Sequence, residues 1–232
     1  MRYATTKCYA CAVSEADEKH VTVTASLSLG WAIHKPVLHM EARYTVYAEG
    51  GMRLDYDVKV ADGMPHLPRF GVEFLMPEEN EYLSYFGRGP VESYRDKRHA
   101  SHQGVFHTTV TDHFEHYVRP QENMAHADTR WMQVMSVAGH GLLAVTTGAD
   151  FSFNCSHFTP RMLTETAHDY ELVPLKETCV NLDYSQDGIG SASCGYPLPP
   201  AWQLAEKSFT FSVRLMPVFA GGADPFYEVT RA

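Results

Sequence analysis

The sequence predicts an all-β protein, a large antiparallel β-sandwich. Three observations predict it: period-two alternation of apolar side chains, an aromatic content of 12%, and almost no helical periodicity. Hydrophobic residues make up 44% of the chain and charged residues 20%, which is a globular composition. A chain of 232 residues can bury a sizeable core as one domain. We therefore expect a single sandwich over residues 1–217, followed by a tail over residues 218–232.

The clearest strands lie in the first 60 residues. Residues 21–29 alternate strictly, with Thr or Ser between the apolar positions. Residues 40–46 and 52–60 then form the two arms of a predicted hairpin. Gly50 and Gly51 lie between the arms, and paired glycines supply the positive φ angles of a tight turn. Residues 62–68 are the expected crossing loop between the two halves of the sandwich.

Later segments complete the predicted sandwich. Residues 70–74 alternate, residues 143–145 and 151–155 form a second predicted hairpin turned at 148–150, and residues 209–215 make a closing strand. The single helical signal spans 159–165, where Thr159 suits the N-cap and Pro160 the first helical position. Because so short a helix is marginal alone, we expect it to pack across a sheet edge. Sheets with two apolar faces must be covered, which predicts two layers.

Charge and cysteine content exclude several classes of protein. The net charge of −9 argues against a nucleic-acid partner, and Asp96 interrupts the densest basic stretch, residues 95–102. No run of about 18 apolar residues predicts a membrane span, and the N-terminus lacks a secretory signal. Five scattered cysteines do not form a disulfide framework, so a reducing, cytoplasmic compartment is expected.

Four sequence blocks occur in a fixed order between residues 70 and 216. They are F-G-R-G-P-V-E-S-Y-R-D at 86–96; Y-V-R-P-Q-E-N at 117–123 with T-R-W at 129–131; F-N-C-S at 153–156 with E-T-A-H at 165–168; and N-L-D at 181–183 with G-I-G-S at 188–191. Together they resemble the C-terminal domain of LacZ-type β-galactosidases, glycoside hydrolase family 2. A lone G-x-G-P motif is unspecific, whereas four ordered blocks are specific.

The resemblance implies a sandwich of the superfold shared with galactose mutarotases, packed beside a catalytic (β/α)₈ barrel. The same region also exists as a separate small subunit. Two barrel glutamates perform retaining hydrolysis, about 5 Å apart, and nothing in this chain resembles the motifs that hold them. The resemblance therefore implies no catalytic residue, cofactor or metal here. The implied partners are the barrel and other domains of the parent enzyme, a galactoside substrate, and further copies in a homo-oligomer.

The resemblance also implies one substrate-binding loop, which follows the G-I-G segment. Some family members carry there a Trp that stacks on sugar, and others carry Cys. This chain resembles the Cys variant, which places Cys194 at the pocket wall and Ser193 beside it. A shift of one residue in the alignment puts Gly195 there instead, and Tyr196 is a candidate replacement for the lost aromatic contact. The alternative is a plain surface loop without ligand contact.

Two other motifs suggest metal or redox chemistry. Cys8 and Cys11 form a C-x-x-C pair, but a structural zinc needs two further ligands and no second C-x-x-C occurs. We interpret them as two buried or incidental thiols. Closely spaced histidines are also present: His99, His102, His113 and His116. Without a helical H-E-x-x-H arrangement, we interpret them as surface or structural residues.

The matched blocks contain four acidic residues: Glu92, Asp96, Glu122 and Asp183. Glu92 with Glu122 is the only catalytic pair they suggest. Their Gly- and Pro-rich surroundings instead favour carboxylates that hold loops by accepting backbone N–H bonds. The candidate partners are Arg95, Arg119 and Arg130, because guanidinium suits bidentate pairing. Tryptophans could stack on sugar, but Trp31 and Trp131 lie in strand-like sequence that favours core packing.

A second functional class shares the same fold. The chain could be a freestanding carbohydrate-binding or mutarotase-like module, and a mutarotase needs a His and a Glu that converge on the sugar ring. His168 and Glu165 are the nearest such pair, but they lie beside the predicted helix and not on facing strands. Polarimetry of galactose anomers would distinguish this class.

Overall fold

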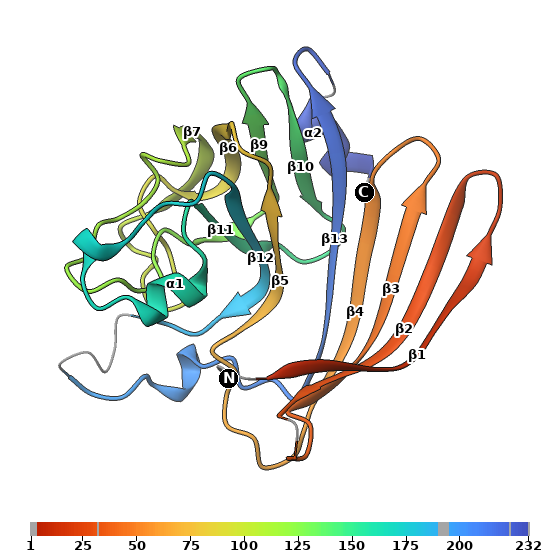
Figure 1. Ribbon diagram of the computed structural model, residues 1–232, viewed down its shortest axis with the longest axis horizontal. Helices are drawn as coiled ribbons and strands as arrows, with labels where there is room; N and C mark the ends of the chain where they lie inside the picture. Colours follow the sequence, from red (N-terminus) through yellow and green to blue (C-terminus); the bar gives the residue numbers. More distant parts are fainter. Residues whose placement is uncertain (1–3, 32, 190–194, 223, 232) are drawn as a thin grey trace.

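The computed structural model describes residues 4–31, 33–189, 195–222 and 224–231, and it is a two-layer antiparallel sandwich (Figure 1). The larger sheet has nine strands, in the spatial order β1 (Thr5–Ala16), β2 (His20–Gly30), β3 (Leu38–Tyr47), β4 (Met52–Val60), β13 (Ser208–Phe219), β10 (His140–Thr146), β9 (Trp131–Ser136), β6 (Asn80–Gly89) and β7 (His102–Thr109). The smaller sheet has four: β5 (Arg69–Met76), β12 (Thr178–Gln186), β11 (Phe151–Ser156) and β8 (His126–Thr129). The predicted fold class is confirmed.

The predicted first hairpin is confirmed. Strands β3 and β4 pair from Leu38↔Val60 to Val46↔Met52. Gly50 and Gly51 between them have φ angles of 103° and 83°, in the left-handed region that favours glycine. The crossing loop is also confirmed, because β4 lies in the large sheet and β5 in the small one.

The predicted hairpin between residues 143–145 and 151–155 is wrong. Strand β10 pairs with β13 and β9, whereas β11 pairs with β12 and β8, so the chain changes sheets at residues 147–150. Gly148 does not have the positive φ of a tight hairpin turn. Instead, the Thr146 hydroxyl donates to the carbonyl of Ala149 at 2.5 Å and accepts from the Gly148 amide at 3.2 Å. Both strands are central in their sheets, and alternation alone cannot distinguish that arrangement from a hairpin.

The helical signal is confirmed as α1 (Pro160–Glu165). Thr159 is its N-cap, and the Thr159 hydroxyl accepts from the Met162 amide at 3.2 Å, while Pro160 occupies the first turn. Leu163 is the residue that α1 buries. Neither this helix nor any other described helix is long and apolar enough to cross a membrane.

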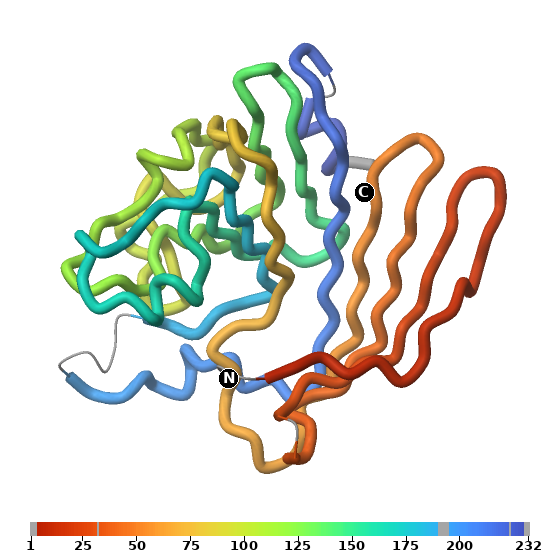
Figure 2. The backbone as a smooth tube through the Cα atoms, in the orientation of Figure 1, coloured from red at the N-terminus to blue at the C-terminus, as the bar shows by residue number. Residues whose placement is uncertain are grey.

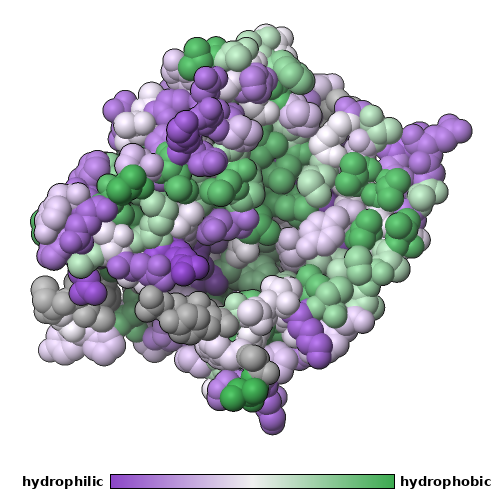
Figure 3. Space-filling model, viewed as in Figure 1, coloured by the Kyte–Doolittle hydropathy of each residue, from purple (hydrophilic) through white to green (hydrophobic). Residues whose placement is uncertain are grey.

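The core lies between the sheets and is rich in aromatic rings. Phe70 of the small sheet contacts Tyr56 and Phe209 of the large sheet edge-on, and Phe153 contacts Tyr85 in the same way. The small sheet covers only part of the large one. Figures 1 and 2 show strands β1–β4 extending beyond it as a separate wing. Figure 3 shows hydrophobic side chains in the hollow between the wing and the small sheet, and Leu27, Met40 and Tyr44 line the groove there.

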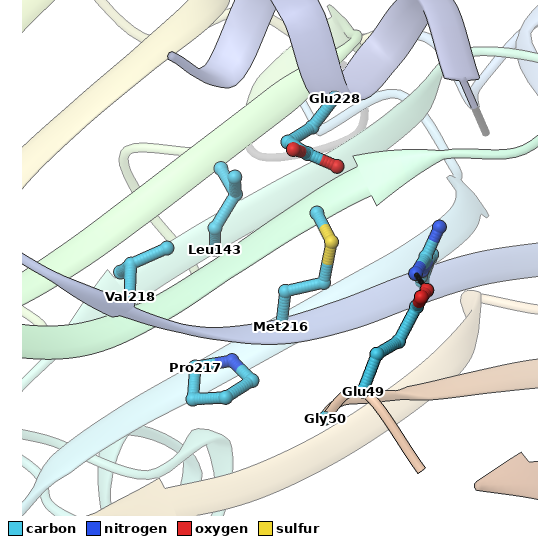
Figure 4. A pocket seen from close by; sticks show the side chains of 8 residues that line it. Glu49, Gly50, Leu143, Met216, Pro217, Val218 and Glu228 are labelled. Carbon is cyan, nitrogen blue, oxygen red and sulfur yellow. Dashed lines mark hydrogen bonds and ion pairs between the residues drawn. The ribbon is translucent and has the colours of Figure 1, made fainter. Parts of the chain in front are cut away.

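The opposite face of the large sheet carries a second apolar cluster. Its buried members are Trp131, Leu143, Val145, Met216 and Val218. Helix α2 (Pro225–Arg231) covers it, with the Phe226 ring 5.7 Å from that of Trp131 and Val229 packed on the cluster. Figure 4 shows the pocket beneath α2, where Glu228 lies above Leu143 and Met216. Core packing of Trp131 is confirmed, whereas the domain boundary at residue 217 stays a prediction.

Candidate functional site

The loop that the sequence assigns to the galactoside pocket begins at Gly188. Ser193 and Cys194 lie outside the residues that the structure describes. Gly195 and Tyr196 are at the surface; the Tyr196 side chain is 91% exposed, and a Cβ at Gly195 would meet no atom within 4 Å. Residues 184–189 and 195–206 form the base of the loop.

The first and last sequence blocks meet at the start of this loop. The Ile189 amide donates to Asp96 Oδ1 at 3.2 Å. The Asp96 carboxylate also lies against the Gly188 backbone so closely that a Cβ at position 188 would overlap it. Glycine at 188 is therefore required by the approach of Asp96, and both motif residues serve one purpose: they fix where the loop begins.

Asp187 ties the loop base to two further segments. Its Oδ2 lies 2.5 Å from His66 Nδ1, and its Oδ1 accepts from the Leu204 amide at 2.6 Å. Its own amide donates to the Pro68 carbonyl at 2.9 Å. The Gly188 amide donates to the carbonyl of Trp202 at 3.1 Å. The crossing loop and the segment that returns to β13 therefore both hold the loop base.

Arg95 fastens the same base from the first sequence block. Its Nε donates to Ser185 Oγ at 2.8 Å, its Nη1 to the Gln203 carbonyl at 2.8 Å, and its Nη2 to Glu206 Oε1 at 3.1 Å. The expectation that Arg95 pairs with a carboxylate of the matched blocks is wrong. Its partner Glu206 lies 111 residues away along the chain and outside every block.

A buried ionic network centred on Arg69 lies behind the loop base. The guanidinium donates to Glu122 Oε2 at 2.8 Å, to both oxygens of Asp183 at 2.5 and 3.2 Å, and to Asn154 Oδ1 at 3.1 Å. Asn154 in turn donates to Glu122 Oε1 at 2.5 Å. Burial raises the pKa of Glu122 to about 7 and also raises that of Asp183, and the Arg69 charge opposes both shifts. The network joins blocks two, three and four.

Arg69 is a partner that the sequence pattern did not predict. The expected partners of the block carboxylates were Arg95, Arg119 and Arg130, and Arg130 instead lies 3.7 Å from Asp150. The available signal was a cation directly after Pro68, at the start of a mostly apolar strand whose other charged residue is Glu73. A charge at the start of such a strand is favoured where a carboxylate partner is near.

Glu92 is a loop anchor, as predicted. It accepts from the Tyr117 hydroxyl at 2.7 Å and from the Met124 amide at 2.9 Å, and it pairs with Lys97. Burial acts to raise the pKa of Glu92, but these hydrogen bonds outweigh it and lower the pKa. Glu92 and Asp96 both accept backbone amides, which confirms the anchoring interpretation for these two residues. Glu122 and Asp183 instead accept from the side chains of Arg69, Asn154 and Gln186. Glu92 and Glu122 each accept hydrogen bonds from at least two protein groups.

The histidine and cysteine motifs do not form a metal centre. In the described ranges, no group of three or more His, Cys, Asp or Glu side chains could hold a metal ion. His113 is buried with its Nε2 2.7 Å from that of His126, whereas His116 lies 2.9 Å from Asp169. Cys8 and Cys11 are exposed free thiols on β1, which excludes the buried alternative for this pair.

His168 and Glu165, the candidate mutarotase pair, form no ion pair with each other in the described structure. His168 Nδ1 lies 3.4 Å from Glu171 Oε2, and Arg161 donates to Glu165 at 3.2 Å. Each member therefore has a different ionic partner. Both residues flank α1 and not a strand.

Comparison with known proteins points to one family. The sequence model described as the β-galactosidase small chain matches residues 2–215. A β-galactosidase from Staphylococcus xylosus is 38% identical over 180 residues, which is 78% of this chain and 18% of the relative. β-Galactosidase BgaC from Bifidobacterium adolescentis is 32% identical over 216 residues, 90% of this chain and 20% of the relative. The chain thus spans about a fifth of the length of these relatives.

Among solved structures, a putative aldose 1-epimerase from Escherichia coli K12 is similar at a TM-score of 0.41. It is 12% identical to this chain, and the match covers 90% of this chain and 68% of the epimerase.

Proposed function

The chain belongs to the β-galactosidase small-chain family, and we propose that it is the C-terminal domain or small subunit of a retaining β-galactosidase. In this role it buttresses the catalytic barrel and contributes the loop from Gly188 to Tyr196 to the galactoside pocket. It hydrolyses nothing by itself. The observation that carries the proposal is the family match over residues 2–215, within which the ordered blocks converge on the base of that loop.

The architecture of the loop base supports a substrate-facing role. Three segments distant in sequence hold residues 184–189: the crossing loop through His66, the first block through Arg95 and Asp96, and the return segment through Trp202 and Leu204. Binding loops work best when a rigid scaffold positions them, because a loop ordered in advance loses less entropy on binding.

The engagement of the acidic residues supports inactivity of the chain alone. A retaining glycosidase needs two carboxyl groups that face one glycosidic bond. Glu92 and Glu122 instead accept hydrogen bonds from Tyr117, Met124, Arg69 and Asn154. These contacts support structural roles for both carboxylates.

Substitution at Cys194 in the parent enzyme tests the loop. We expect Cys194→Trp to lower KM for a nitrophenyl galactoside severalfold, because an indole offers a sugar more contact area than a thiol. Cys11→Trp, on the exposed face of β1, is the matched control and should leave KM unchanged. Unchanged KM and kcat in Cys194→Trp and Cys194→Ser would show that the loop does not contact the substrate. Hydrolysis by the chain alone that survives stringent purification would refute the non-catalytic role.

A further inference from the structure

A polar cavity of about 190 Å³ lies next to the loop base. It opens where β11 begins and β12 ends, and its wall includes Arg98, Asp128, Asp150, Ser152, Tyr184 and Gln186. It also touches Arg95 and Ser185, the pair that fastens the loop base, and among the described residues its wall includes none of the loop after Gly188.

Arg98 presents an unused donor in this wall. Its Nη2 pairs with Asp128, but its Nε is buried and has no hydrogen-bond partner among the described residues. Buried donors are nearly always satisfied in folded proteins, so the unpaired Nε–H marks the Arg98 guanidinium, which lines the cavity, as short of one acceptor.

Asp128 shows that the wall is held in a fixed conformation. Its φ is +52°, a left-handed conformation that non-glycine residues rarely adopt. Arg88 Nε donates to its carboxylate at 2.7 Å, and Gln103 Nε2 donates to its carbonyl at 2.8 Å. Such backbone conformations persist where the surroundings determine them strongly, and they concentrate at binding sites.

The wall chemistry selects the class of ligand. Two cations, Arg95 and Arg98, face two anions, Asp128 and Asp150, so the cavity carries no net charge that would select an ion. The remaining polar groups are hydroxyls and an amide, which both donate and accept, and Tyr184 adds an aromatic ring. The cavity volume of about 190 Å³ exceeds what a single water needs and suits one small ring.

We propose that this cavity binds a neutral, hydroxyl-rich ligand, a single sugar unit, through Arg98, Asp128 and Ser152. The assignment of the ligand as a sugar rests on the proposed galactosidase role. The cavity is then a second sugar-contacting site, distinct from the Cys194 loop.

Titration of lactose and galactose into the full chain, followed by amide NMR shifts, tests the site. We expect saturable shifts at residues 127–130, 150–152 and 184–186. Arg98→Met removes the orphan donor and should weaken binding at least tenfold. Ser152→Met, which fills the cavity without removing a charge, should abolish it. Arg43→Met, an exposed arginine on β3, is the matched control and should bind as the wild type does.

Three outcomes would overturn the site. The wild type could show no shifts, Arg98→Met and Ser152→Met could both bind the sugars as tightly as the wild type does, or the chain could bind acetate in preference to both sugars. The two proposals fail separately. Absence of sugar binding together with a Cys194-dependent KM in the parent refutes the cavity alone. If the cavity binds sugar but substitutions at Cys194 leave KM and kcat of the parent enzyme unchanged, the loop role alone is refuted.

Discussion

The wing and the rest of the sandwich are built by different means. In the wing, strands β1–β4 pair as simple hairpins, and every residue of β1 is exposed. Among the buried polar residues of the described chain, only Thr22 and Ser28 belong to the wing; all others lie between Asn80 and Gln186. The sequence blocks fall in that second region, the motif half (residues 69–206). The four sequence blocks therefore coincide with the region that holds most of the buried polar residues, and not with the strands of simple hydrophobic alternation.

The difference predicts where the molecule is sensitive. Buried ion pairs and loop anchors depend on single partners, because loss of one partner leaves the other unsatisfied. Wing strands depend on many weak backbone and side-chain contacts, so one substitution matters little. Substitutions matched in type but placed in the two regions should therefore differ sharply in their effects.

The largest effect is expected for Arg69→Met. It leaves the buried Asp183 and the half-buried Glu122 without their cation, which should lower the free energy of unfolding by about 3–5 kcal/mol. Arg43→Met in the wing is the control, with an expected change within about 0.5 kcal/mol. Urea denaturation of both variants measures the difference. Equal losses would show that the network contributes no more than a surface arginine does.

The buried histidine pair predicts a pH dependence specific to the motif half. Burial lowers the pKa of His113 to about 4 and that of His126 to about 3. The unfolded chain therefore binds more protons than the folded one below the ordinary histidine pKa of about 6.5. The free energy of unfolding should therefore fall as the pH drops from 6.5 towards 4, by up to about 1.4 kcal/mol per pH unit for each ring.

Comparison of unfolding curves for the wild type and His113→Gln/His126→Gln isolates this contribution, and His39→Gln in the wing should keep the wild-type slope. The opposite slope would carry a specific meaning. The rings make three contacts, to Cys155 O at 3.1 Å, to Arg88 O at 2.6 Å and to each other at 2.7 Å. Two neutral imidazoles supply only two N–H groups. Stability that rises on acidification would mean that the pair holds a third proton.

An intermediate effect is expected for Gly188→Ala. The added methyl overlaps the Asp96 carboxylate and must break its bond to the Ile189 amide, at a cost of about 1–2 kcal/mol. Gly148→Ala is the control within the motif half, because a Cβ there meets nothing within 4 Å. Thermal unfolding compares the two. If both variants melt together, the close approach of Asp96 does not constrain the loop base.

Local signals predicted the fold well, and distant partnerships explain the failures. The Gly50-Gly51 hairpin and the Thr159 cap involve neighbours in sequence, and both were predictable. The second hairpin was mispredicted because alternation does not say which sheet a strand joins. At the site, the anchors could be guessed from loop composition, but their partners could not: Asp96 and Ile189 are 93 residues apart, and Arg69 and Asp183 are 114 apart.

The smallest effect is expected for Val13→Lys, at the free edge of the wing. Val13 is 62% exposed on β1, which pairs only with β2. The free energy of unfolding should change by less than about 0.5 kcal/mol. A charge on an exposed edge strand should also reduce self-association at high concentration, which sedimentation can measure. A loss above about 1 kcal/mol that grows with protein concentration would mean that a second copy covers β1. Strand β1 would then be exposed only in the monomer.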